Sequence, residues 1–393
     1  MRITWVTRSF LDYRVPVFGE LNRLVDGGLK LMYCGDVMLS RVCRKAERVL
    51  GQNSLAIRGE RRIVGRMCME DGRANAEMRI PYQPGLIRAV ASSRPSVLIS
   101  DGFCQWTYAA LFLRALKGIP HVMCYERTAH TERNAQWYRK SYRRIALRWI
   151  DALCCSGRLC GEYVRSLGFP AARTTYGHMV ADVEGMRRTA AEVTPAQTSE
   201  LATKLALRGL VFLYVGRLTL LKGLGELLHA WEAFSSATPC APATLLLVGE
   251  GAQRTELERF CRARHLTNVR FAGAVDYDAL GLYYRVADAF IIPTLEDNWS
   301  LVVPEAMACG LPILCSKYNG CWPEYVTAGN GWVFDPLQVG DTCDCLRQCL
   351  QARTRLPEMG RRSREIVSQH TAAEAAEAIL AACRIAIGRH RPR

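Results

Sequence analysis

The sequence has no long apolar segment and no apolar leader. None of its 393 residues lie in a stretch that approaches the roughly 18 consecutive apolar residues of a membrane-spanning helix. The N-terminus, Met1 to Ser9, holds only a short apolar run between Arg2 and Arg8. This run is too short for the core of a signal peptide and fits a first strand. We therefore expect a cytoplasmic protein.

Paired cysteines at metal-binding spacings are also missing. The 17 cysteines are scattered, and the adjacent pair Cys154 and Cys155 lies in an apolar run typical of a buried strand. Cys343, Cys345 and Cys349 lie in a stretch that favours a helix. Because no export signal is evident, we interpret the cysteines as reduced thiols that serve as small apolar residues, in preference to a zinc site.

Acidic residues are too few to balance the basic ones. The chain has 52 Lys and Arg against 37 Asp and Glu, which leaves a formal net charge of +15. Such an excess attracts anions, among them nucleotides, anionic lipid head groups and nucleic acid, and charge alone does not choose among these partners. The hydrophobic content of 49% is that of an ordinary globular protein.

Short apolar strands alternate with helical stretches along the chain, which predicts an α/β fold with parallel sheets covered by helices. The first half predicts strands at 3–7, 29–34, 97–100, 121–125 and 152–156, and helices at 17–25, 86–91, 106–117, 137–149 and 158–167. The second half repeats the pattern, with strands at 210–215, 244–248, 269–272, 289–292 and 312–315, and helices at 224–234 and 253–264. The arginine-rich segment 37–81 is too weakly periodic to assign.

These halves predict two Rossmann-like domains. We place the N-terminal domain at 1–186, an Ala- and Thr-rich linker at 187–203, and the C-terminal domain at 204–370. Residues 371–393 form a last helix and a basic tail. Open α/β sheets bind ligands at the carboxyl ends of their strands, so we expect the ligand in a cleft between two facing domains.

The first motif of the second half is the loop from Gly216 to Gly223, G-R-L-T-L-L-K-G, between a predicted strand and a predicted helix. Gly216 permits close approach of a ligand to the backbone. Arg217 and Lys222 flank the loop, and two fixed cations near helix amides would stabilise the charge that a departing diphosphate gains. The alternative is a solvated Arg and Lys on a surface loop.

The second motif is Leu247-Val-Gly249-Glu-Gly251, a strand that enters a glycine turn before a helix. A nucleotide could lie against the backbone at Gly249 and Gly251, and a plain strand-to-helix turn explains the motif equally well.

The third motif runs from Pro293 to Pro312 and leads from a strand through a polar turn into a helix. Asp297 lies in the turn, and Glu305 lies about one turn into the helix. Exposed amides at the helix start suit phosphate or sugar hydroxyls, and a carboxylate on the helix suits ribose hydroxyls. Two surface acids near a helix start are the alternative.

In this order the three motifs resemble the C-terminal domain of glycosyltransferase family 4, whose members have the GT-B fold. That family has a G-R-L-x-x-x-K-G loop, a V-G-x-G turn and an E-x7-E element within E-x-F/W-G-L-x-x-x-E-A-M-A-x-G-x-P. The resemblance covers most of 210–336 and is most specific over 297–312.

The resemblance implies a role for each matching residue. Arg217 and Lys222 would hold the donor diphosphate, Asp297 would lie near the donor sugar, and Glu305 would bind the ribose. Phosphate would contact the backbone at Ser300, Leu301 and Val302. The chain departs from the family pattern twice, because Asp297 replaces the first glutamate, with Glu296 beside it as a competitor, and Ser300 replaces a glycine.

The first half resembles the same family more weakly. Its D-Y-R-V-P-V-F segment, which starts at Asp12, is similar to a branch without the double-glycine first loop, so Arg14 would approach the acceptor or the diphosphate. In many members a strand matching 120–125 ends in a histidine near the reacting carbon. Here Glu126 and Arg127 follow that strand. Glu126 would orient the acceptor or stabilise positive charge at the anomeric carbon, and Arg127 would bind the acceptor; a strand-end glutamate paired with arginine is the alternative.

The pair Asp276 and Asp278 imitates the metal-binding D-x-D of another glycosyltransferase fold. We reject that role because the pair precedes a helix, where Asp is a natural cap. The cations of the first motif and the helix dipoles replace a metal, so we expect neither metal nor cofactor.

A basic stretch at 133–148 holds six cations and no acid. Cations at helical spacing share this stretch with large apolar residues: Arg139, Lys140, Arg143, Arg144, Arg148, Trp137, Ile145 and Trp149. A basic helix with interfacial aromatics can rest on anionic lipid, with roughly 1 kcal/mol from each cation. We prefer this interpretation to a solvated helix whose Trp residues fill the core.

The sequence therefore predicts a retaining glycosyltransferase that moves sugar from a UDP- or GDP-sugar to a hydroxyl acceptor. The acceptor is expected to be a lipid-linked or polysaccharide glycan of the cell envelope, with the protein peripheral on the inner face of the cytoplasmic membrane. The alternatives are a sugar-nucleotide epimerase or phosphorylase of the same fold, a nucleic-acid-binding protein, and an inactive scaffold. We do not expect nucleic acid as a partner, since the cations are spread out and no reading module is present.

Overall fold

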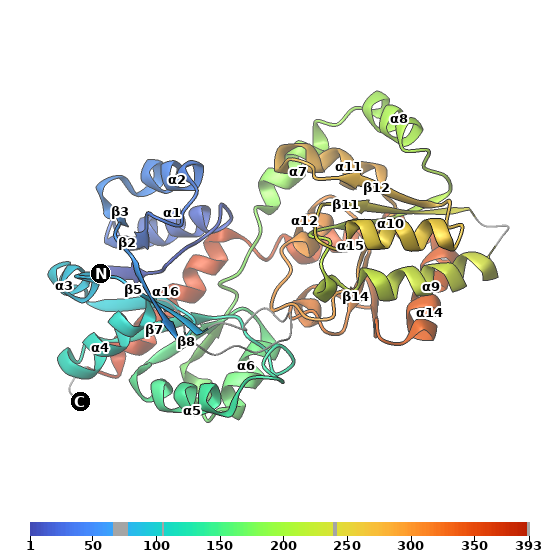
Figure 1. Cartoon of the computed structure of the whole chain (residues 1–393). Coiled ribbons are helices and arrows are strands. Elements are labelled where there is room, and N and C mark those ends of the chain that lie inside the picture. Colours follow the sequence, from blue (N-terminus) through green and yellow to red (C-terminus); the bar gives the residue numbers. More distant parts are fainter. Residues whose placement is uncertain (66–77, 104–105, 239–241, 391–393) are drawn as a thin grey trace. The chain divides into compact units, whose positions relative to one another are not determined.

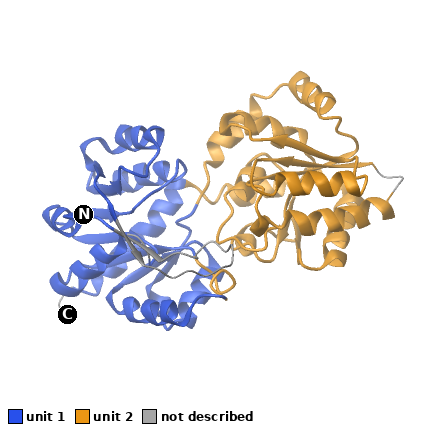
Figure 2. Cartoon of the chain, in the orientation of Figure 1, with its two compact units in different colours: residues 1–126, 134–179, 372–393 blue, residues 127–133, 180–371 orange. Residues whose placement is uncertain are grey.

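The computed structural model describes residues 1–65, 78–103, 106–238 and 242–390, and the chain divides into two compact units (Figure 2). Unit 1 comprises Met1–Glu126, Asn134–Met179 and Ala372–Arg393. Unit 2 comprises Arg127–Arg133 and Val180–Thr371. Each unit has a parallel sheet with helices packed on it, which confirms the predicted α/β fold.

Unit 1 is built on a seven-stranded sheet in the order β3-β2-β1-β6-β7-β8-β9, in which all neighbours are parallel. Its central strands read as continuous apolar runs because both of their faces are buried. The strands are β1 (Ile3–Val6), β2 (Leu29–Cys34), β3 (Ser54–Ile57), β6 (Val97–Asp101), β7 (His121–Tyr125), β8 (Ala152–Cys155) and β9 (Thr174–Tyr176).

The described residues of unit 1 form seven α-helices, which connect or cover these strands (Figure 1). They are α1 (Arg14–Leu24), α2 (Ser40–Leu50), α3 (Leu86–Ser92), α4 (Thr107–Lys117), α5 (Trp137–Ala146), α6 (Arg158–Ser166) and α16 (Ala372–Gly388). The unassigned segment 37–81 supplies α2, β3 and an antiparallel pair, β4 (Arg61–Gly65) with β5 (Met78–Tyr82); its residues 66–77 lie outside the described residues.

Unit 2 has a six-stranded parallel sheet in the order β12-β11-β10-β13-β14-β15. The strands are β10 (Leu210–Val215), β11 (Ala243–Val248), β12 (Val269–Gly273), β13 (Ala289–Ile292), β14 (Ile313–Ser316) and β15 (Gly331–Phe334). Its helices are α7 (Val183–Ala191), α8 (Pro195–Lys204), α9 (Leu224–Ala237), α10 (Arg254–Ala263), α11 (Leu280–Val286), α12 (Val302–Ala308), α13 (Trp322–Tyr325), α14 (Val339–Gln351) and α15 (Leu356–Val367).

The core of unit 2 lies between its sheet and the helices α9 and α14. Phe212 of β10 packs edge-on against Trp231 of α9, with ring centroids 5.5 Å apart, and both side chains are fully buried. The three cysteines of α14, Cys343, Cys345 and Cys349, belong to the same core cluster. Their interpretation as small apolar residues of a helix is confirmed.

The segment 187–203, which we predict to be a linker, lies in helices α7 and α8 of unit 2. Thr194 and Gln197 form a reciprocal capping box at the start of α8, and Pro195 occupies its first turn. Leu201 is the one buried residue of α8. A helix with one buried position has no apolar periodicity, which is why the sequence pattern there resembles a linker.

The last helix, α16, returns to unit 1 and packs against α1 and the strands β7, β8 and β9 (Figure 1). Thr175 of β9 donates a hydrogen bond to the carbonyl of Ala378 at 2.9 Å. Beyond the helix, His390 Nε2 lies 3.0 Å from a carboxylate oxygen of Asp151. The C-terminal 372–393 segment is thus part of the unit that begins the chain.

None of the helices in the described ranges combines the length and the apolar character needed to cross a bilayer.

Asp151 is the buried charge that joins several segments of unit 1. Its carboxylate accepts hydrogen bonds from Arg114 Nε at 2.6 Å and from the amide of His121 at 3.0 Å. Burial favours the neutral acid, but these bonds outweigh burial and hold the pKa of Asp151 below its usual value.

We expect Asp151→Ala to lower the free energy of unfolding of unit 1 by about 3–5 kcal/mol, because it leaves Arg114 without its buried partner. Urea unfolding measures the change. The matched control is Glu162→Ala, which removes an exposed pair with Arg158 on α6 and should cost less than about 1 kcal/mol. Equal effects of the two variants would contradict the structural role of Asp151.

Candidate functional site

Two loops at the centre of the unit 2 sheet carry most of the predicted donor-binding residues. The chain adds β11 and β12 on one side of β10, then crosses to add β13, β14 and β15 on the other side. The strand order therefore reverses between β10 and β13, and open α/β sheets bind ligands beside such a switch point. One loop follows β10 from Gly216 to Gly223, and the other follows β13 from Pro293 to Leu301.

These two loops are joined by an ion pair between Lys222 and Asp297, whose Nζ and Oδ2 atoms are in direct contact. Both side chains are largely buried. The backbone of Gly223 lies so close to β13 that a Cβ there would stand 2.1 Å from the Pro293 carbonyl oxygen, and its φ is +66°. Only glycine fits such a position, and its close approach places the preceding Lys222 beside Asp297.

Asp297 has two further donors in its own loop. Ser300 Oγ donates to Oδ2 at 2.6 Å, and the amide of Trp299 donates to Oδ1 at 3.2 Å. Ser300 and Asp297, the two residues that depart from the family pattern, are thus hydrogen-bonded to each other.

The neighbouring acid, Glu296, has a different partner. Arg133 Nη1 lies 2.8 Å from Glu296 Oε2. In the sequence Arg133 is one cation of the basic stretch, and no motif distinguishes it. Of the two candidate acids, Asp297 pairs with Lys222 and Glu296 pairs with Arg133.

Arg217 is exposed, at the beginning of the same loop as Lys222. Its carbonyl accepts a hydrogen bond from Tyr214 Oη at 2.9 Å. Burial raises the pKa of Tyr214, the negative charge of Asp297 raises it further, and the positive charge of Arg217 opposes this. Among the described residues, no hydrogen bond or ion pair joins the Arg217 side chain to Lys222 or Asp297.

Three amides at the start of α12 complete this part of the site. Among the hydrogen bonds of the described residues, none is donated by the backbone amide of Ser300, Leu301 or Val302. Free amides at the first turn of a helix carry partial positive charge and suit an anion.

Glu305, the second acid of the motif, lies on α12 among tyrosines and is 7% exposed. Tyr284 Oη donates to Glu305 Oε2 at 3.1 Å. Burial raises the pKa of Glu305 to about 7; hydrogen bonds from Tyr284 and Tyr277 oppose the shift, and the charge of Asp182 adds to it. The contacts of Glu305 are thus a separate set from those of Lys222 and Asp297.

The glycines of the second motif have a structural explanation. A Cβ at Gly249 would stand 1.9 Å from the Gly216 carbonyl oxygen, and one at Gly251 would stand 2.2 Å from the Leu218 carbonyl oxygen. The amide of Leu218 also donates to the Glu250 carbonyl at 2.9 Å. Gly249 and Gly251 therefore let their turn pack tightly against the loop of the first motif.

In unit 1 the strand order reverses between β1 and β6, and Arg14 lies at that point, at the start of α1. Its Nη2 is 3.4 Å from Asp101 Oδ1, and its guanidinium lies over the ring of Trp5. Burial alone would lower the pKa of Arg14, but the charge of Asp101 outweighs burial and raises it. Nη1 is buried and has no hydrogen-bond partner among the described residues.

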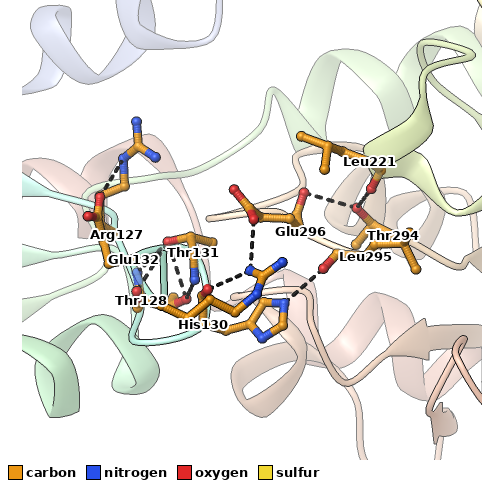
Figure 3. Close-up of polar contacts among 10 residues, drawn as sticks. Arg127, Thr128, His130, Thr131, Glu132, Leu221, Thr294, Leu295 and Glu296 are labelled. Atoms are coloured by element: carbon orange, nitrogen blue, oxygen red, sulfur yellow. Dashed lines mark hydrogen bonds and ion pairs between the residues drawn. The ribbon is translucent and has the colours of Figure 1, made fainter. Parts of the chain in front are cut away.

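Glu126 and Arg127 follow β7 but fall into different units. Glu126 is half-buried in unit 1, and its charge helps to raise the pKa of Tyr13, which burial raises first. Arg127 belongs to unit 2, where its Nε lies 3.6 Å from Glu132 Oε1 (Figure 3).

His178 is a residue of this region that no sequence motif marks. Its Nε2 donates to the Tyr125 carbonyl at 3.0 Å, and its Nδ1 is buried without a partner among the described residues. Burial and the charge of Arg14 lower the pKa of His178 to about 3, so the ring is neutral. The residue follows β9, a strand too short and too exposed to predict, so nothing in the local sequence reveals its place beside Arg14.

Asp276 occupies the N-cap position of a 3₁₀ turn, Tyr277–Ala279, but its side chain makes no capping hydrogen bond. The predicted capping contact is therefore wrong, because the Ala279 amide of this turn donates instead to the Asp276 backbone carbonyl, at 2.9 Å. Over the described ranges, no group of three or more His, Cys, Asp or Glu side chains is arranged to hold a metal ion.

The basic stretch forms α5 and a following 3₁₀ turn, Leu147–Trp149. Trp137 is 78% exposed, and Tyr142, Ile145 and Trp149 are also exposed, so the tryptophans do not fill the core. Arg143, in contrast, is buried and donates to Tyr163 Oη at 3.0 Å. Its expected place on the basic face is wrong, because the helix turns that position toward α6.

Comparisons with known proteins match both halves of the chain. A family model for glycosyl transferases group 1 matches residues 209–352, and a glycosyl transferase 4-like domain model matches residues 37–177. A D-inositol 3-phosphate glycosyltransferase of Catenulispora acidiphila is 30% identical over 158 residues, which is 38% of this chain and 37% of that protein. An alpha-monoglucosyldiacylglycerol synthase of Acholeplasma laidlawii is 26% identical over 144 residues, 36% of this chain and 35% of that protein.

The chain spans about a third of the length of these two curated relatives. Among solved structures, HepE of Anabaena in complex with UDP has a TM-score of 0.71 at 16% identity, covering 97% of this chain and 99% of that one. At this identity the likeness concerns the fold.

We expect the raised pKa of Glu305 to appear in the pH dependence of stability. Between its usual value of 4.5 and about 7 the folded state binds more protons than the unfolded state, so stability falls as pH rises through this window. The parent chain should lose on the order of 3 kcal/mol in free energy of unfolding between these pH values, and Glu305→Gln should abolish this loss. Urea unfolding of the free protein from pH 4.5 to 8 measures it.

The control for this variant is Glu358→Gln, at an exposed position of α15. This control variant should keep the fall in free energy of unfolding with pH that the parent chain shows. If Glu305→Gln shows the same pH dependence of the free energy of unfolding as the parent chain, groups other than Glu305 cause it.

Proposed function

Because the chain belongs to the group 1 glycosyltransferases of the GT-B fold, we propose that it moves a glycosyl group from a nucleoside diphosphate sugar to a hydroxyl acceptor, with retention of configuration. The donor is a UDP- or GDP-sugar and no metal takes part. The acceptor is a lipid-linked or polysaccharide glycan of the cell envelope.

The observation that carries this proposal is the Lys222–Asp297 ion pair at the switch point of unit 2, beside the free amides of 300–302. Lys222 and Arg217 would meet the diphosphate, and the amides would bind its oxygens. As the bond between the anomeric carbon and the phosphate oxygen breaks, its electron pair passes to the diphosphate, where fixed positive charge is worth most. Asp297 would hold Lys222 in place and face the donor sugar.

The acceptor oxygen attacks from the face that the diphosphate leaves. A bond forms between that oxygen and the anomeric carbon, and the departing phosphate oxygen takes the hydroxyl proton. This path needs no protein nucleophile, which suits a site where Asp297 is already occupied by Lys222 and Ser300.

Glu305 and the carboxyl edge of unit 1 supply the remaining roles. Glu305, with Tyr284 beside it, would accept hydrogen bonds from the ribose hydroxyls. Arg14, with its unpartnered Nη1, and Glu126 would lie along the acceptor. Arg127, which is paired with Glu132, is the less favoured of the predicted acceptor residues.

An anionic membrane surface would present a lipid-linked acceptor to unit 1. The exposed face of α5 and its 3₁₀ turn joins Trp137 and Trp149 to Arg144 and Arg148, a composition that favours the interfacial region of a bilayer. One relative is named as the synthase of a glucosyl lipid, which agrees with such an acceptor. We propose that the chain works as a peripheral protein on the cytoplasmic face.

A donor panel tests the proposed reaction. Thermal shifts with UDP-, GDP-, dTDP- and ADP-sugars identify the nucleotide, and release of nucleoside diphosphate that depends on a glycan acceptor establishes transfer. We expect Lys222→Ala to lower this turnover by roughly 100-fold or more, because the leaving group loses a fixed cation.

Asp278→Ala is the matched control and should leave turnover close to that of the parent chain, since Asp278 is not part of the cluster around Lys222. Full activity in Lys222→Ala would remove the leaving-group role. Release of nucleoside diphosphate without any acceptor would favour an epimerase, and formation of a sugar phosphate from a glycan and phosphate would favour a phosphorylase. Binding of nucleic acid without binding of nucleotide sugars would favour a nucleic-acid-binding protein.

Membrane binding is tested by sedimentation with vesicles of phosphatidylglycerol and phosphatidylcholine. We expect Trp137→Ala combined with Arg144→Glu to weaken binding to anionic vesicles about 10-fold or more, because each change removes an interfacial contact and the reversal also adds repulsion. Arg158→Glu on α6, another exposed arginine of unit 1, is the control for net charge. Equal losses in both would show that no particular face is used.

A further inference from the structure

A short piece of the first half of the chain is built into unit 2. Residues 127–133 belong to unit 2, although Glu126 before them and Asn134 after them belong to unit 1. The segment is folded on itself, since Thr128 and Thr131 exchange hydrogen bonds and the amide of Glu132 donates to the Thr128 carbonyl at 3.1 Å (Figure 3). It is therefore a defined turn rather than an extended connection.

His130 contacts two loops, the loop after β13 that contains Asp297 and the neighbouring loop after β14. Its Nε2 donates to the Leu295 carbonyl at 2.8 Å, in the loop after β13 (Figure 3). Its ring stacks on Tyr318, in the loop after β14, with centroids 4.3 Å apart and planes 18° from parallel. Thr128 adds to the second contact, because a Cβ at Gly320 would stand 3.2 Å from its methyl carbon.

Arg133 binds the residue next to Asp297. Its Nη1 contacts Glu296 Oε2 at 2.8 Å and also donates to the His130 carbonyl at 2.6 Å, so one guanidinium fixes both the acid and the turn that carries His130. Arg133 also neutralises Glu296, which leaves Asp297 as the acid paired with Lys222.

The two loops that this segment binds are also joined to each other through Asp297. Asp297 forms a parallel bridge with Asn319, and the amide of Gly320 donates to the Asp297 carbonyl at 3.0 Å. Leu295 and Thr294 in turn bind the Leu221 carbonyl, one residue before Lys222. His130 thus holds Leu295 and Tyr318 directly, and it holds Leu221, next to Lys222, through Leu295.

We propose that His130 and Arg133 are positioning residues for the donor-sugar acid: they fix the turn 294–300 so that Asp297 and Lys222 keep the geometry that glycosyl transfer requires. This inference rests on the proposed function of that site. Catalytic geometry is sensitive to displacements of about 1 Å, which can cost on the order of 100-fold in rate. The Arg133–Glu296 pair is partly exposed, so it contributes little to folding and its removal should leave the fold intact.

The test compares His130→Ala and Arg133→Ala with Arg362→Ala, which removes an exposed Arg–Glu pair elsewhere in unit 2. Turnover is measured with UDP-glucose and GDP-mannose, and the affinities for UDP and GDP are measured separately. We expect the first two variants to lose 10- to 100-fold in kcat with nucleotide affinity unchanged within about twofold, and Arg362→Ala to match the parent chain.

Two rescue variants separate positioning from general damage. His130→Gln keeps a donor for the Leu295 carbonyl and should recover part of the lost kcat. Arg133→Glu combined with Glu296→Arg restores the ion pair with reversed charges, so its kcat should exceed that of Arg133→Glu alone. Hydrogen exchange of the 294–300 backbone should quicken in both alanine variants and remain normal in α9.

The outcomes also distinguish this inference from the proposed function. Full turnover in both alanine variants overturns the inference, as does a loss of nucleotide affinity that parallels the loss of turnover. Unchanged hydrogen exchange at 294–300 overturns it whether or not the parent chain transfers sugar. A parent chain that binds nucleotide but neither transfers nor hydrolyses a sugar donor contradicts the proposed function, while the exchange data still decide whether the segment fixes the turn.

Discussion

The ion pair between Lys222 and Asp297 is the contact on which the geometry of unit 2 depends. It joins the loops that follow β10 and β13, the two strands between which the sheet changes direction. The carboxyl ends of these strands leave the sheet side by side, so their loops must meet, and Gly223 lets them meet closely enough for a salt bridge. Because both partners are largely buried, the pair is little screened by solvent and fixes the position of the Lys222 cation.

Unit 1 repeats this arrangement with different chemistry. Its switch point lies between β1 and β6, and there Arg14 meets Asp101 and the ring of Trp5. His178 is kept neutral beside this arginine by burial and by its charge. Both units therefore hold a buried or partly buried cation at the one sheet position where an α/β fold leaves room for a ligand. Although the chain is basic, each of these two cations is paired with an acid, Arg14 with Asp101 and Lys222 with Asp297.

The turn around Asp297 shows how a site is stabilised by residues distant in sequence. Ser300 and Trp299 bind the carboxylate locally, whereas His130 and Arg133 arrive from a part of the chain about 165 residues earlier. A polar turn has little apolar area to bury, so its conformation depends on directional hydrogen bonds and on ion pairs. The separation of the two acids, with Glu296 on Arg133 and Asp297 on Lys222, follows from where those two cations lie.

The sequence by itself determined the α/β alternation, most strands of both sheets from their apolar runs (all but β3, β9 and β15), and the order of the three motifs that carry Arg217, Lys222, Asp297 and Glu305. These features are local, and apolar periodicity and glycine turns encode them directly. Tertiary structure alone decided the rest. Helix α8 was hidden because Leu201 is its one buried residue, and α16 joins unit 1 through packing on α1 and on β7, β8 and β9, which lie far away in the sequence. Which acid pairs with Lys222, and the contacts of Arg133 and His130, depend on residues brought together across the chain, and such contacts leave no periodicity to detect.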